Sequence, residues 1–89
     1  MTPTIAAVCA VFFAVSAADE RIAAELRDKA DSAMVAIIDA APDQTELDAQ
    51  VRAIFAAIKA DPARGMTFLA RRSSECVQMI NDMAAARYE

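Results

Sequence analysis

Apolar residues recur along the middle of the chain with the spacing of one face of a helix. Pro42 and Pro62 bound this stretch, and Asp43 is followed three residues later by Glu46, the spacing of a capping box at a helix start. The pattern predicts a helix over about residues 44–60. Its apolar face consists of Leu47, Val51, Ile54, Phe55 and Ile58.

The stretch after Pro62 has the same helical spacing. Asp61 can cap a helix in which Pro62 is the first residue, although Gly65 could delay the start by a few residues. We predict a helix over about residues 62–88. Its apolar stripe consists of Leu69, Cys76, Val77, Ile80, Met83 and Ala84.

The N-terminal stretch continues the pattern over a greater length. Apolar residues follow one another in steps of three or four from Val8 to Ile37, and only Asp19 interrupts them. The pattern predicts one long helix over about residues 3–41. Asp19 would lie where this helix leaves its neighbours and the charge reaches solvent. The alternative is a buried polar contact that fixes the register with a partner helix.

The composition agrees with helices throughout. Apolar residues make up 57% of the 89 residues, alanine is abundant, and Gly65 is the single glycine. No run alternates β-branched or aromatic residues with polar ones, as a strand would. Short connections favour antiparallel neighbours. We therefore predict one all-α domain over residues 1–89: a small antiparallel three-helix bundle, or a helical hairpin, with a long, hydrophobic N-terminal helix.

Residues 1–18 leave three interpretations open. As the first turns of the long helix, they would belong to the fold. As a signal peptide, they offer an apolar core at 5–15 and small residues at 15–17 for cleavage, although no Lys or Arg precedes the core. As a membrane anchor, residues 2–18 reach only the lower end of the length that a bilayer needs. Export, membrane association and a cytoplasmic assembly all stay open.

Charge and missing residue types narrow the chemistry. A formal net charge of −4 is unsuited to binding nucleic acid or an anionic membrane surface. The chain has no histidine, which is the commonest general base and transition-metal ligand. Several acids lie four residues from a base, as Glu25 does from Lys29, which is typical of a solvated helix face. We predict no catalytic residue, no cofactor and no metal ligand, and hence no enzyme.

The two cysteines do not mark a reactive site. Cys9 lies in the apolar stretch, where free cysteine commonly packs as a small hydrophobe. Cys76 follows an acid and has no histidine to activate it. Two cysteines are too few for a disulfide scaffold or a zinc site. If residues 1–17 were removed, Cys76 would be left unpaired.

What remains is apolar surface on the N-terminal helix. At 1.5 Å per residue, a helix over 44–60 would be roughly 25 Å long and one over 3–41 roughly 57 Å, too long to be covered. We predict a non-enzymatic structural or interaction subunit whose apolar N-terminal helix docks into a protein assembly or onto a second copy. The alternative is an exported small helical binding protein without residues 1–17 or 1–18. The candidate interaction surface consists of Val8, Phe12, Phe13 and Val15.

Overall fold

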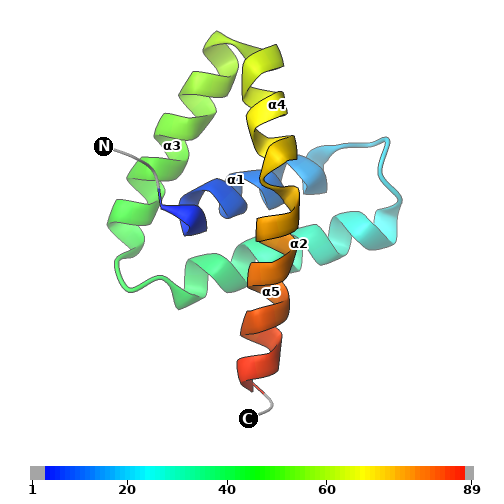
Figure 1. Cartoon of the computed structure of the whole chain (residues 1–89), viewed down its shortest axis with the longest axis vertical. Helices are drawn as coiled ribbons and strands as arrows, with labels where there is room; N and C mark the ends of the chain where they lie inside the picture. Colours follow the sequence, from blue (N-terminus) through cyan, green and yellow to red (C-terminus); the bar gives the residue numbers. More distant parts are fainter. Residues whose placement is uncertain (1–3, 88–89) are drawn as a thin grey trace.

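The computed structural model describes residues 4–87, and these form helices and no strand, so the all-α prediction is confirmed. Within residues 4–87, five helices take the place of the three predicted. In Figure 1, α1 runs through the middle of the molecule and α2 runs back beside it, with α3 rising on one side and α4 leading into α5. The helices are α1 (Ile5–Ala18), α2 (Ala24–Ala40), α3 (Gln44–Ala60), α4 (Pro62–Arg71) and α5 (Ser73–Arg87).

The central helix is α1, the most apolar part of the chain. It contacts each of the other four helices. A helix that is apolar on all sides is stable only when it is covered on all sides, and the other helices provide that cover. The side chains buried along α1 are those of Ala7, Val8, Cys9, Ala10, Val11 and Phe13.

The predicted single helix over 3–41 is wrong, because the chain turns at residues 19–23. Asp19 ends α1, where its N–H donates to the Ser16 carbonyl over 3.3 Å, and α2 then runs antiparallel to α1. Both halves of the pattern contribute buried residues: Ala33 and Ile37 pack against α1, whereas Val8 packs against α3 and α4. The predicted start at residue 3 lies outside the described residues. Within them, Thr4 caps α1 by accepting a hydrogen bond from the Ala7 N–H.

An ion pair closes the turn between α1 and α2. The Arg21 guanidinium donates to both carboxylate oxygens of Asp19, at 3.0 and 2.9 Å, and the Arg21 backbone N–H donates to Oδ1 at 3.0 Å. The hydrogen bonds from the Arg21 side chain, followed by the one from its backbone, lower the pKa of Asp19 from 3.8 to about 2. The Asp19 carboxylate therefore stabilises the turn between α1 and α2.

Asp19 is expected to make stability depend on pH at the acid end. Because its folded-state pKa lies below its unfolded value of 3.8, its contribution is present above that value and is lost as the pH falls through about 2. Urea unfolding of the wild type and of Asp19→Asn should therefore differ near neutral pH and converge in acid. Arg21→Gln serves as the matched variant and should behave like Asp19→Asn. A difference that persists unchanged into strong acid would contradict this role of the ion pair.

The helix predicted over residues 44–60 is confirmed as α3, whereas the segment predicted as the third helix forms two helices, α4 and α5. Asp43 caps α3 by accepting from the Glu46 N–H at 3.0 Å, and Asp61 caps α4 by accepting from the Arg64 N–H at 3.2 Å. The predicted helix over 62–88 is interrupted at Arg72, where α4 ends and α5 begins. Position 88 lies outside the described residues. Leu69 of α4 and Cys76 of α5 are both buried, in different groups of core side chains.

Gly65 lies inside α4, where it permits close packing against α3, and it does not delay the start of the helix. A Cβ atom at this position would lie 2.7 Å from Ile58 Cγ1 and 2.9 Å from the Ile58 Cα. Real Cβ atoms do not approach other carbon atoms so closely, so the backbones of α3 and α4 would have to separate.

Gly65→Ala is therefore expected to destabilise the fold although alanine is the better helix former. Overpacking typically costs about 1–3 kcal/mol, against about 1 kcal/mol gained in helix propensity, which leaves a net loss of up to about 2 kcal/mol. Urea unfolding monitored by circular dichroism measures the difference. Ala63→Gly, on the exposed face of α4, is the control and should lose only the propensity difference. A more stable Gly65→Ala protein would show that the two helices separate at little cost.

Candidate functional site

The predicted interaction surface lies within the fold. Val8 and Phe13 are only 5% and 8% exposed, and Phe12 and Val15 are half-buried. The Phe12 ring packs edge-on against the ring of Phe13, with the ring centroids 5.1 Å apart. The face of α1 that was expected to need a partner is covered by helices of the same chain. The reason is the turn at residues 19–23, which shortens α1 and brings α2 onto it.

Two groups of buried side chains cover opposite faces of α1. One joins α1 to α2 and α5, and the other joins α1 to α3 and α4. Both of these faces of α1 are therefore occupied by helices of the same domain. The first group is Cys9, Ala10, Phe13, Ala30, Ala33, Ile37 and Cys76, and the second is Ala7, Val8, Val11, Leu47, Ile54 and Leu69.

A disulfide joins Cys9 of α1 to Cys76 of α5. Both residues are fully buried, and their Cα atoms lie 5.2 Å apart. The sequence places each cysteine on an apolar helix face, but it does not show that these two faces meet, so the pairing was not predicted. Disulfides form and persist mainly in oxidising compartments. The disulfide is therefore expected to persist, and to stabilise the fold, in a compartment of that kind.

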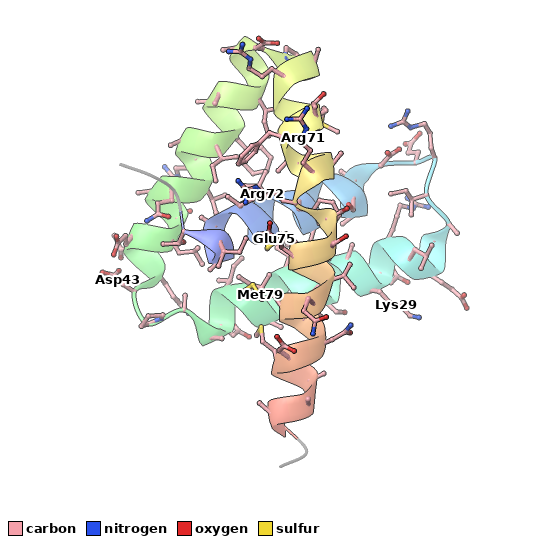
Figure 2. All side chains as sticks on the ribbon, in the orientation of Figure 1. Lys29, Asp43, Arg71, Arg72, Glu75 and Met79 are labelled. Atoms are coloured by element: carbon pink, nitrogen blue, oxygen red, sulfur yellow. A yellow bond between two sulfur atoms is a disulfide. The ribbon has the colours of Figure 1, made fainter. Side chains whose placement is uncertain are left out.

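An open groove lies beside α5, between α5 and the turn from α2 to α3. Its volume is about 330 Å³. In Figure 2, Met79 lies on the flank of α5 that faces this turn, which bears Asp43. We call this hollow the Met79 groove. Its buried or half-buried lining consists of Ala6, Ile37, Ala41, Leu47, Gln50, Met79 and Met83, and its exposed lining of Thr4, Ala40, Pro42, Asp43 and Glu46.

The side of the groove near the N-terminus is held in place by hydrogen bonds. The Thr4 N–H donates to Gln50 Oε1 at 2.8 Å, and the Thr4 hydroxyl donates to the same oxygen at 3.1 Å. These bonds fix the start of α1 against α3. Asp43 and Glu46 give the mouth of the groove its charge, and among the described side chains no Lys or Arg lines it. An apolar side chain that carries positive charge nearby would match this lining.

Another hollow lies on the outer face of α4, with a volume of about 470 Å³. Its one large apolar residue, Phe68, is 39% exposed. The Arg72 guanidinium carbon lies 5.4 Å from the centroid of the Phe68 ring, and Arg72 also pairs with Glu75 at 3.2 Å. We call this surface the α4 hollow. It is lined by Ala63, Arg64, Thr67, Phe68 and Arg71.

The two hollows lie in segments of opposite charge. Residues 30–51 contain five acids and no Lys or Arg, and residues 62–74 contain three arginines and no acid. Among residues 4–87, neither Arg64 nor Arg71 takes part in an ion pair. The charges of the chain are therefore unevenly distributed: residues 30–51 are acidic and residues 62–74 are basic, although the net charge is −4.

Other chemistry has little to build on in the described residues. Within 4–87, no three His, Cys, Asp or Glu side chains come together as metal ligands would. None of the helices between Thr4 and Arg87 combines the length and the apolar character that crossing a membrane requires. Of the basic and serine residues at 70–75, Arg72 is held by Glu75, and Ser73 begins α5.

Comparisons with protein-family models, with curated proteins and with solved structures gave no significant match. The class of the protein therefore follows from its own fold: a small all-α domain in which one disulfide links the central helix to the C-terminal helix.

Proposed function

We propose that the chain is a non-enzymatic interaction domain that works in an oxidising compartment and binds its partner in the Met79 groove. The observation that carries the proposal is the groove itself, whose apolar lining has two carboxylates at its mouth. Binding sites are commonly concave, mostly apolar, and furnished with a few polar groups that orient the ligand. Methionine side chains suit such a site because they adapt to different apolar shapes.

The partner we propose is a peptide segment with an apolar side chain next to positive charge. The apolar side chain would contact Met79 and Met83, and the positive charge would lie near Asp43 and Glu46. This assignment replaces docking through α1, because Val8 and Phe13 are already used in the core. The class of function, an interaction protein, is the one the sequence predicts.

The disulfide supports the choice of compartment. A buried bond between Cys9 and Cys76 is suited to an exported protein. A form without residues 1–17 would lose Cys9 and nearly the whole of α1, together with the core that α1 organises. We therefore propose that, if this chain is exported, its functional form retains α1 and is not cleaved at residue 17 or 18.

Selection of peptides from a random displayed library on the oxidised chain tests the groove. Selected peptides should combine an apolar residue with Lys or Arg, and calorimetry should show at least about tenfold weaker binding to Met83→Glu than to the wild type. Val77→Glu is the matched control, because Val77 lies on the same helix, is 50% exposed and does not line the groove. Circular dichroism confirms that each variant is folded. Equal binding to Met83→Glu and wild type would place the site elsewhere.

A further inference from the structure

We infer that the Met79 groove takes the α4 hollow of a second copy of this chain. The inference rests on the proposed function of the groove and names its occupant. Phe68 offers the apolar side chain, and Arg64 and Arg71 offer the positive charge beside it. The groove offers the apolar lining with Asp43 and Glu46 at its mouth. Each surface has what the other lacks.

Charge complementarity favours a second copy over an unrelated partner. Arg64 and Arg71 make no ion pair within residues 4–87, and Asp43 and Glu46 are exposed and likewise form none there. An arginine opposite a carboxylate steers the two surfaces together and fixes how they meet. The contact would also explain why Phe68 is exposed in a single copy, because an aromatic residue that becomes buried on binding commonly anchors an interface.

The positions of the two surfaces allow copies to join head to tail. In Figure 1, α4 lies in the upper part of the molecule, and the turn from α2 to α3 lies on its left side, below the middle. A contact between two different surfaces is heterologous, so a pair of copies retains one free groove and one free hollow. Both surfaces are small, and interfaces below about 1,200 Å² are typically weak and transient. We therefore expect reversible association with a dissociation constant of roughly 10–1000 µM.

The response to salt separates this contact from non-specific association. Copies with a net charge of −4 repel one another, and added salt screens this repulsion, so non-specific contacts become stronger with salt. A contact made by arginine and carboxylate pairs becomes weaker with salt. Sedimentation velocity of the oxidised full chain at low and high salt should therefore show association that salt reduces.

A charge exchange identifies the surfaces. Glu46→Lys changes the groove and Arg71→Glu changes the hollow, and each alone should weaken self-association by about tenfold or more, because attraction becomes repulsion. An equal mixture of the two variants should associate again, since each altered surface then meets its complement. Lys29→Glu and Asp31→Lys are the controls, since they change the charge equally outside both surfaces and should leave association unchanged. Phe68→Ala should weaken association without changing charge.

The outcomes are distinct. Association that salt weakens, that each single variant reduces and that the mixture restores establishes the contact. A chain that stays monomeric to about 1 mM at low salt overturns the inference, because the expected dissociation constant does not exceed about 1 mM. So does association that Glu46→Lys and Arg71→Glu leave intact, or a mixture that fails to recover. If selected peptides still bind the groove of a monomeric chain, self-docking fails and the proposed function stands. If no peptide binds the groove either, both fail.

Discussion

Reduction of the disulfide between Cys9 and Cys76 is expected to lower the free energy of unfolding by about 4 kcal/mol. The bond closes a loop with a sequence separation of 67 residues, and in the chain-entropy model a loop of this size restricts the unfolded chain by about that amount. Small domains are stable by only about 5–15 kcal/mol in total. The loss would therefore leave the reduced chain marginally folded or unfolded at physiological temperature.

Urea unfolding with and without a dithiol reductant measures this difference, and alkylation with mass spectrometry confirms the thiol state of each sample. The variant with both Cys9→Ala and Cys76→Ala should match the reduced wild type and should not respond to the reductant. Equal unfolding midpoints for oxidised and reduced protein would contradict the structural role of the bond. Two free thiols in protein purified without reductant would show that it does not form.

The consequence for binding follows from how α5 is held. Among the described side chains of α5, Cys76 is the only one that is fully buried in the core, while Met79, Ile80 and Met83 are half-buried. Without the disulfide, α5 would be attached mainly by these partial contacts, and Met79 and Met83 would no longer be fixed beside α2 and α3. We therefore expect a reducing environment to weaken binding in the groove together with the fold, which fits a protein of an oxidising compartment.

The sequence predicted those elements whose signals are local. The helix over 44–60 was obtained with its boundaries because Pro42, Asp43 and Pro62 act through neighbouring residues. The turn at 19–23 contains no proline or glycine, and its residues are compatible with a continuing helix. What breaks the helix there is the gain from packing α2 against α1, which a local pattern does not contain.

The same turn explains why the candidate interaction surface lies largely within the core. Whether Phe13 is exposed, and whether Cys9 meets Cys76, depends on how distant helices are arranged, and that arrangement follows from the turn. The Met79 groove is likewise made by residues from α1, α2, α3 and α5. Its carboxylates and methionines were visible in the sequence, but their proximity was not.

Val11→Asp is expected to unfold the whole domain, because Val11 is fully buried against the apolar residues of α3 and α4. A carboxylate without a partner at this position costs several kcal/mol, a large part of the stability of a small domain. Leu26→Asp is the matched control: Leu26 lies on α2 and is 56% exposed, so the change should stay within about 0.5 kcal/mol. Near-ultraviolet circular dichroism and the dispersion of amide resonances would show which variant retains the fold.

This comparison also separates the interpretations of the N-terminal stretch. If α1 is the centre of the fold, Val11→Asp destroys the packing of α2 to α5, since both groups of buried side chains include residues of α1. If α1 were a detachable leader or a helix that docks elsewhere, the remaining helices would stay folded, and only export or association would change. A folded Val11→Asp protein would restore docking through α1. An unfolded one beside a folded Leu26→Asp protein would assign residues 5–18 to the core, and any partner would then have to bind the outer surface of the domain.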